Sequence, residues 1–128
     1  MTDDLSDRER YEQGMTVRRA VLGDEHVDRA NAGITELTAD FQDFITRVAW
    51  GDVWSRPGLT RRERSIAVLT SLIAHGHHEE LAMHLRAAIR NGLTQDEIKE
   101  VILQTAIYSG VPSANAAFKI AQQVFADS

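Results

Sequence analysis

Four of the five histidines in this chain lie in one ten-residue stretch, HGHHEELAMH, at residues 75–84, together with two adjacent glutamates. On a helix, His77, Glu80 and His84 would lie within about 60° of one another, beside an apolar stripe. Imidazole and carboxylate groups in such a line can bind a metal ion or transfer protons. They can also form a solvated helix start, where acidic residues interact well with the helix dipole.

The spacing of these residues weighs against a metal site. His77 and His84 would be about 10 Å apart along the helix axis, and the metalloprotease pattern places its two histidines only four residues apart. Glu80 precedes His84 by four residues, so their side chains can meet. Histidine titrates near neutral pH, which suits general acid–base chemistry. From the pattern alone, a solvated helix start stays the simplest interpretation, and an acid–base site is the main alternative.

The composition limits the kind of protein. The chain has 128 residues, the size of one domain, and no apolar run approaches a membrane span. Its net charge of −5 disfavours nucleic acid as a partner, because phosphate binding needs a basic surface. Without cysteine there is no disulfide or thiol redox chemistry. The acidic, polar start MTDDLSDRERYEQG does not resemble a signal peptide, so we expect a cytoplasmic protein with no membrane partner.

The elements that would position the histidines are helices. Helix signals recur along the chain and strand-like alternation is nowhere sustained, so we predict an all-α fold, a single-domain bundle of about six helices over residues 1–128. The segment SIAVLTSLIA is apolar nearly all round and predicts a central, buried helix. The segment WGDVWSRPGL predicts an irregular connection, because Pro57 stops a helix. The expected helices include residues 7–22, 25–32 and 77–91. Two further helices are expected after capping boxes at Thr60–Glu63 and Thr94–Glu97. The remaining two are a helix with Thr38 as its N-cap and a last helix capped by Ser113.

Several segments carry a resemblance to a known family. WGDVWSRPGL, MHLRAAIRNG and YSGVPSANAAF occur in this order, after YEQGMTVRRAVLGDEHVDRA near the start. On these segments the chain resembles the carboxymuconolactone decarboxylases, a branch of the larger family that includes the alkylhydroperoxidase D-like proteins. The resemblance covers nearly the whole length. It implies an all-α, alkylhydroperoxidase D-like fold, assembled as a homo-oligomer, usually a hexamer built as a trimer of dimers.

The resemblance also implies an activity. It is the decarboxylation of 4-carboxymuconolactone, a small anionic lactone, to 3-oxoadipate enol-lactone in protocatechuate breakdown, with no cofactor and no metal. The redox branch of the family carries C-x-x-C-x-x-x-H, and the equivalent positions here look like His77, Glu80 and His84. Because both cysteines are absent, thiol peroxidase chemistry cannot occur. The alternative is a non-redox member of the fold that binds a small ligand or acts on another substrate.

The resemblance gives the histidine stretch a narrower interpretation. Within the decarboxylases, Glu80 and His84 look like usual motif residues, whereas His77 and His78 look like variable positions. We therefore expect His84 to donate a proton or to stabilise an oxyanion, with Glu80 orienting it.

The lactone's two carboxylates suggest arginine anchors. Arg64 is expected in the first turn of the buried helix, where its guanidinium could bind a carboxylate through two hydrogen bonds. An ion pair with Glu63 is an equally good interpretation. Arg56, in the connection before that helix, is a second candidate, although loop arginines are usually solvated.

Aromatic and amide side chains complete the candidate binding residues. Trp50 and Trp54 could wall the pocket, or could anchor the core or a subunit contact. Tyr108 and Asn115 flank the Gly110–Pro112 turn and could donate hydrogen bonds to the substrate. For Asn115, satisfying backbone groups at the helix start is the favoured alternative.

Overall fold

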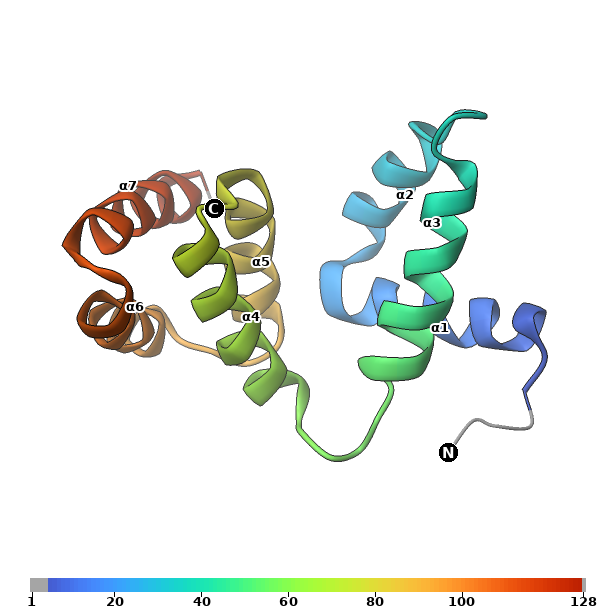
Figure 1. Ribbon diagram of the computed structural model, residues 1–128, viewed down its shortest axis with the longest axis horizontal. Coiled ribbons are helices and arrows are strands. Elements are labelled where there is room, and N and C mark those ends of the chain that lie inside the picture. Colours follow the sequence, from blue (N-terminus) through green and yellow to red (C-terminus); the bar gives the residue numbers. More distant parts are fainter. Residues whose placement is uncertain (1–4, 128) are drawn as a thin grey trace. The chain divides into compact units, whose positions relative to one another are not determined.

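The computed structural model describes residues 5–127, and these form helices with no β-strand (Figure 1). The all-α prediction is confirmed. The predicted number of about six helices is close to the seven α-helices and one π-helix found in this range. The chain divides into two compact units, at residues 1–60 and 61–128. The single domain stays a prediction, and each unit is described by itself.

The first unit contains four helical segments. They are α1 (Asp7–Leu22), α2 (Asp24–Ala32), α3 (Ala39–Ile45) and the π-helix η1 (Thr46–Val53). A capping box starts α1, because the Ser6 side chain accepts from the Glu9 N–H and the Glu9 carboxylate accepts from the Ser6 N–H. The predicted bounds of the first helix are confirmed, and the second begins one residue earlier than expected.

Helix α1 packs very closely against η1, and glycine makes this approach possible. A Cβ atom on Gly14 would lie 1.9 Å from the Thr46 carbonyl oxygen, and one on Gly51 would lie 2.6 Å from the Arg10 carbonyl oxygen. Polar contacts hold the same crossing. Arg10 pairs with Asp52, and Gln13 Nε2 donates to the Gly51 carbonyl at 2.8 Å.

Thr38 occupies the N-cap position of α3 as predicted, but its side chain makes no capping hydrogen bond, and its hydroxyl accepts from the Thr35 N–H, 3.0 Å away. One prediction in the first unit is wrong. The segment WGDVWSRPGL is not irregular from its start, because residues 50–53 continue the helix in π geometry and the turn begins only at Trp54. The Trp54 N–H donates to the Ala49 carbonyl, an i→i+5 bond of 2.9 Å. Pro57 is too far along the chain to disturb these bonds.

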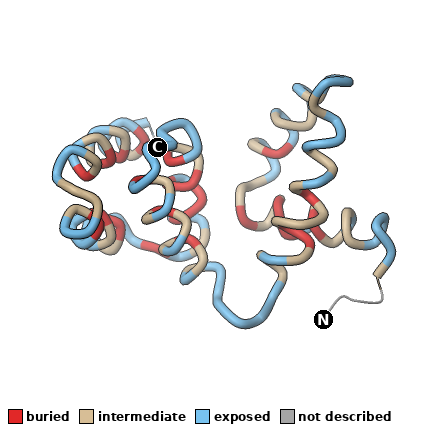
Figure 2. Tube along the Cα trace, viewed as in Figure 1, coloured by how far each residue is buried: buried red, intermediate tan, exposed pale blue. Residues whose placement is uncertain are grey.

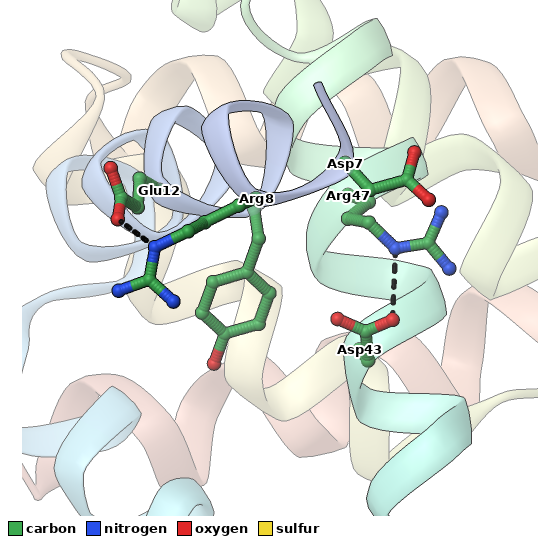
Figure 3. A pocket seen from close by; sticks show the side chains of 6 residues that line it. Asp7, Arg8, Glu12, Asp43 and Arg47 are labelled. Carbon is green, nitrogen blue, oxygen red and sulfur yellow. Dashed lines mark hydrogen bonds and ion pairs between the residues drawn. The ribbon is translucent and has the colours of Figure 1, made fainter. Parts of the chain in front are cut away.

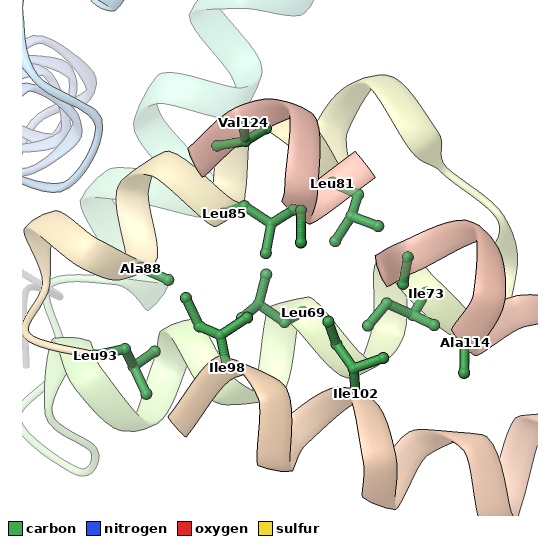
Figure 4. Packing of buried hydrophobic residues seen from close by; sticks show 12 residues of the cluster. Leu69, Ile73, Leu81, Leu85, Ala88, Leu93, Ile98, Ile102, Ala114 and Val124 are labelled. Atoms are coloured by element: carbon green, nitrogen blue, oxygen red, sulfur yellow. The ribbon is translucent and has the colours of Figure 1, made fainter. Parts of the chain in front are cut away.

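The second unit is a bundle of four helices. They are α4 (Arg61–His75), α5 (His78–Arg90), α6 (Gln95–Ser109) and α7 (Val111–Ala126), and α4 contacts each of the other three. Figure 4 shows the apolar cluster that they enclose. Its members are Leu69, Ile73, Leu81, Leu85, Ala88, Leu93, Ile98, Ile102, Ala114, Ala117, Ala121 and Val124. A Val or Leu that is fully buried in this way contributes about 1.5–3 kcal/mol.

The prediction that α4 is buried on most sides is wrong. Only Ser65, Leu69 and Ile73 are buried, at a spacing of four residues, while Ala67 and Ala74 are exposed. Figure 2 shows how buried, intermediate and exposed positions alternate along the chain. A helix in a four-helix unit needs only one inward stripe. Ile66 and Leu72 are partly buried and pack against the same core, whereas the remaining apolar residues of α4 lie away from it.

The ends of α6 decide where the chain turns. The predicted capping box at its start is confirmed, since the Thr94 side chain accepts from the Glu97 N–H and the Glu97 carboxylate accepts from the Thr94 N–H. At its other end, Gly110 has a φ of 101°, which favours glycine, and α7 begins directly after it. Ser113 is therefore not the N-cap of the last helix, contrary to the prediction. Among residues 5–127, no helix has the length and apolar character that crossing a membrane would require.

Candidate functional site

The start of the histidine stretch is exposed to solvent. Helix α5 begins at His78, with His77 as its N-cap residue, and His78 and Glu79 are exposed as predicted. The rings of His75 and His77 stack on each other with centroids 5.7 Å apart, and His75 Nδ1 lies 2.8 Å from the Ser71 carbonyl oxygen. Within the described residues, no group of three or more His, Asp or Glu side chains is placed to hold a metal ion.

His84 differs from the other histidines of this stretch because it is buried. Only 7% of its surface is exposed, and its Nδ1 atom is buried. On the same helix, Leu81, Leu85 and Ala88 point into the apolar cluster (Figure 4). A buried imidazole offers one donor and one acceptor in its neutral form, and it works in a site from which much of the water is excluded.

Glu80 lies one turn before His84 on the same helix and is exposed. One side of α5 therefore carries an exposed carboxylate and, one turn later, a buried imidazole. A carboxylate at the outer end and an imidazole at the inner end can handle a proton that enters or leaves with the solvent.

Arg64 lies on the neighbouring helix, in the first turn of α4, and it is half-buried with a buried Nε atom. The next residue, Ser65, accepts a hydrogen bond of 3.1 Å from Asn91 Nδ2 across the α4–α5 pair. Asn91 follows His84 by seven residues, which is a rise of about 10 Å along the helix axis. Because Arg64 is next to the residue that contacts Asn91, the backbones of Arg64 and His84 are separated by about this distance along the axis of α5. This separation suits the binding of a ligand at one end and its chemistry at the other.

Tyr108 and Asn115, at the α6–α7 turn, are both exposed, and 84% of the Tyr108 surface is open. A tyrosine with this exposure buries little of its surface in the described chain. Its position suits an external contact as well as the predicted hydrogen bond to a substrate.

The remaining candidates belong to the first unit. Trp50 is 7% exposed in η1, and its ring centroid lies 5.1 Å from that of Trp54, with the planes tilted by 34°. This burial matches the core anchor that was the alternative interpretation of the two tryptophans. Arg56 is exposed in the turn before Pro57.

Three cavities within the units are not lined by any of the predicted site residues. The first, of about 380 Å³, lies against α1, α3 and η1, and its charged walls form the ion pairs Arg8–Glu12 and Arg47–Asp43 (Figure 3). The second and third lie in the second unit, with volumes of about 320 and 240 Å³, and α6 lines both. Acidic residues or apolar walls dominate these two, which makes them poor sites for an anion.

Sequence reasoning missed Arg18. This residue of α1 is 6% exposed, and burial lowers the pKa of its guanidinium. The signal in the sequence is its position on α1. Arg18 follows Val17 and lies between Gly14 and Val21 on the buried side of this helix. A charged residue on an inward stripe is unusual and points to a special role.

The chain is similar to known proteins over most of its length. The family model described as "Carboxymuconolactone decarboxylase family" matches residues 39–123. A 4-carboxymuconolactone decarboxylase of Acinetobacter baylyi is 50% identical over 96% of this chain and 92% of its own length. A nitrosuccinic acid decarboxylase of Metarhizium robertsii is 41% identical over 98% of this chain and 88% of its own. A 4-carboxymuconolactone decarboxylase sequence from Pseudomonas putida, matched over its full length, is 50% identical over 38% of this chain.

Proposed function

Because this chain belongs to the carboxymuconolactone decarboxylase family, we propose that it is a carboxy-lyase that converts 4-carboxymuconolactone to 3-oxoadipate enol-lactone. The observation that carries the proposal is the 50% identity with the Acinetobacter baylyi enzyme over nearly the whole of both chains. The absence of cysteine supports it further, because the thiol chemistry of redox relatives needs a thiolate.

The substrate itself can accept the electrons that decarboxylation releases. The carbon that loses CO2 is conjugated through a C=C bond to the lactone carbonyl. When the bond to the carboxylate breaks, its electron pair moves through the ring to the carbonyl oxygen and leaves a dienolate. A proton must then be added to the ring carbon beside that carbonyl. The protein must hold the carboxylates, stabilise the developing oxyanion and supply the proton.

Two residues of α5 and one of α4 fit these three tasks. His84 is buried and carries a donor, so it would protonate the ring carbon or stabilise the oxyanion. Glu80, exposed one turn away, would orient the imidazole and exchange its proton with solvent. Arg64 would bind a carboxylate through two hydrogen bonds from its guanidinium. Its backbone lies about 10 Å from that of His84 along the helix axis.

The other candidates have weaker support as substrate ligands. Arg56 and Asn115 are exposed, and Trp50 belongs to the core of the first unit. We keep Arg56 as a second carboxylate anchor and Trp54 as a pocket wall, because both lie in the WGDVWSRPGL segment on which the family resemblance rests. Tyr108 would donate a hydrogen bond to the substrate only if a further surface covers it.

Self-association is part of this proposal. An apolar surface at the α6–α7 turn is open in the described chain, with exposures of 48% to 84%, and its residues are Leu103, Ile107, Tyr108 and Val111. Such a group of exposed apolar side chains is typical of an interface. A homo-oligomer, and specifically a hexamer formed as a trimer of dimers, would cover this surface with a second copy of the chain.

The similarity to the Metarhizium robertsii protein favours a second candidate reaction, the decarboxylation of nitrosuccinate. Its chemistry is parallel, because a carboxylate leaves from the carbon that carries the nitro group, and the electron pair moves to the nitro oxygens. Both substrates carry two carboxylates and hold their own electron sink. The same proton donor and carboxylate anchor would serve either of them.

A direct assay separates the two candidates. The purified protein is given fresh 4-carboxymuconolactone or nitrosuccinate, and released CO2 and the organic product are followed. We expect enol-lactone from the first substrate, with kcat/KM well above that for the second. A higher kcat/KM with nitrosuccinate would transfer the assignment to the second reaction. No product from either, at high protein concentration, would leave a binding function in their place.

A further inference from the structure

Arg18 is the single buried side chain with a fixed charge among residues 5–127. Its Nη1 atom donates to Gln42 Oε1 at 3.4 Å and to Thr46 Oγ1 at 3.3 Å. Both bonds are long and both acceptors are neutral. Its Nε atom is buried and has no hydrogen-bond partner within the described chain. The guanidinium is therefore desolvated without receiving a compensating charge.

The neighbouring arginines show that this arrangement is not general in the first unit. Arg10 pairs with Asp52 and Asp7, and Arg19 pairs with Asp24 and Asp28. These guanidiniums are more exposed than Arg18, yet each has carboxylate partners. Around Arg18, the ionisable neighbour that affects its pKa is Tyr11, and burial is the larger influence and lowers that pKa.

An uncompensated buried cation is costly, because desolvation removes the hydration energy of the charge. Such a group is stable in a fold only if the surrounding packing outweighs the cost or an anion binds to it. The guanidinium edge that carries Nε matches the two oxygens of a carboxylate. Gln42, which is half-buried, can turn its amide to present an N–H donor to the same anion.

We propose that Arg18, together with Gln42 and Thr46, forms a binding site for a small carboxylate on the first unit. A dicarboxylate substrate of the proposed reaction belongs to this ligand class. The proposal rests on the buried charge and its neutral neighbours, and its test below does not need turnover. Loss of the proposed reaction would therefore leave the test of this site unchanged.

Thermal unfolding of the full chain with succinate as the probe tests the site. Both tryptophans lie in the first unit, so their fluorescence reports on the part of the chain that holds Arg18. We expect succinate to raise the wild-type Tm, whereas neutral succinamide at the same ionic strength leaves it unchanged. Arg18→Met should have a higher Tm than the wild type without ligand, because the uncompensated charge is gone. It should also lose the succinate shift.

A neighbouring arginine supplies the matched control. Arg19→Met should keep the succinate shift, since Arg19 already has two carboxylate partners at the surface. If Arg18→Met does not fold, Arg18→Lys decides, because lysine keeps the charge and loses the two-pronged donor. Its apparent affinity for succinate should fall at least about fivefold.

Three results would overturn the proposal. They are an absent succinate shift in the wild type, a full shift in Arg18→Met, and unchanged affinity in Arg18→Lys. A fourth result would show that the carboxylate bound by Arg18 comes from a second copy of the chain and not from a small ligand. In that case the wild-type Tm would rise with protein concentration, the Arg18→Met Tm would not, and succinate would have no effect at any concentration.

Discussion

At the scale of single residues, burial separates the histidines that the sequence presents as a group. Their density at residues 75–84 suggested a common role, but only His84 of the four is buried. The placement of Glu80 and His84 on one side of α5 was accessible from the sequence, because a spacing of four residues brings two positions to the same side of a helix. The role of Arg18 was not, because burial of a charge depends on the partner helix and not on its own.

Replacing His84 tests the proposed proton transfer. His84→Gln should lower kcat by about 10²- to 10⁴-fold, because the amide keeps a hydrogen bond but cannot transfer a proton near neutral pH. Turnover of 4-carboxymuconolactone is measured alongside far-UV circular dichroism to check the fold. His78→Gln is the control, since His78 is exposed and its loss should leave kcat unchanged. Near-normal turnover in His84→Gln would remove this residue from the mechanism.

At the scale of helices, the sequence predicted starts and stops better than contacts. The capping box at Thr94 and Glu97 is a local device, so its residues alone define it. The close crossing of α1 and η1 depends on two glycines 37 positions apart, and neither predicts its partner alone. The same reason explains why π geometry at residues 46–53 was missed, because it follows from packing and not from propensity.

The crossing gives a prediction about stability. Gly14→Ala should lower the free energy of unfolding by about 3 kcal/mol or more, because its Cβ would overlap the Thr46 carbonyl oxygen and backbone must move. Urea unfolding followed by tryptophan fluorescence measures this loss. Gly58→Ala is the control, since nothing lies within 4 Å of a Cβ there and stability should stay the same or rise slightly. Equal effects of the two substitutions would contradict the close crossing.

The start of α6 gives a prediction about acid. Hydrogen bonds from Arg62 and from the Thr94 backbone lower the pKa of Glu97 from 4.5 to about 2. A carboxyl whose pKa is lower in the folded state stabilises the fold above its unfolded pKa. Its contribution is lost as the pH falls through the range from about 4.5 to about 2.

Glu97→Gln should therefore destabilise the protein at pH 7, and the difference from the wild type should shrink as the pH is lowered to about 2. Urea unfolding at several pH values measures both. Glu100→Gln, an exposed substitution on the same helix, should show a much smaller difference at pH 7. A constant difference for Glu97→Gln at all pH values would show that its charge plays no part.

At the scale of the whole molecule, the chain contains two compact units, whereas its length and composition predicted one domain. Length sets only the amount of core that a chain can build, and it does not determine how the chain divides that core. The seven residues 54–60 between η1 and α4 contain no regular helix, and most are exposed. The family resemblance predicted the fold class correctly, and the single domain stays a prediction.

The positions of the tryptophans make the single-domain prediction testable. Both lie in the first unit, so tryptophan fluorescence reports on that unit alone, while far-UV circular dichroism reports on helices throughout the chain. If the chain unfolds as one cooperative domain, the two urea transitions should coincide. A circular dichroism transition that is broader or displaced from the fluorescence transition would show that the units unfold separately.

The exposed surface at the α6–α7 turn gives a prediction about assembly. Ile107 is 80% exposed, and Ile107→Glu should shift the protein from the oligomer to smaller species, because a buried charge would oppose the contact. Light scattering after size-exclusion chromatography measures the mass. Gln104→Glu adds the same charge to the same helix without removing an apolar side chain, so it should preserve the mass. A monomeric wild type would contradict the proposed assembly.

The π-helix η1 also has a consequence for how the chain tolerates changes in length. Its hydrogen bonds link residues five positions apart, so each turn holds more residues than an α-helix of the same rise. Deleting one residue within 46–53 would allow ordinary α geometry without breaking the helix. The backbone would then shift against α1, where the Thr46 carbonyl and Gly51 lie too close to Gly14 and Arg10 for a side chain to fit between them. Insertions and deletions should therefore be rarer here than in the exposed residues 56–60, and homologous chains of different length should differ in that connection instead.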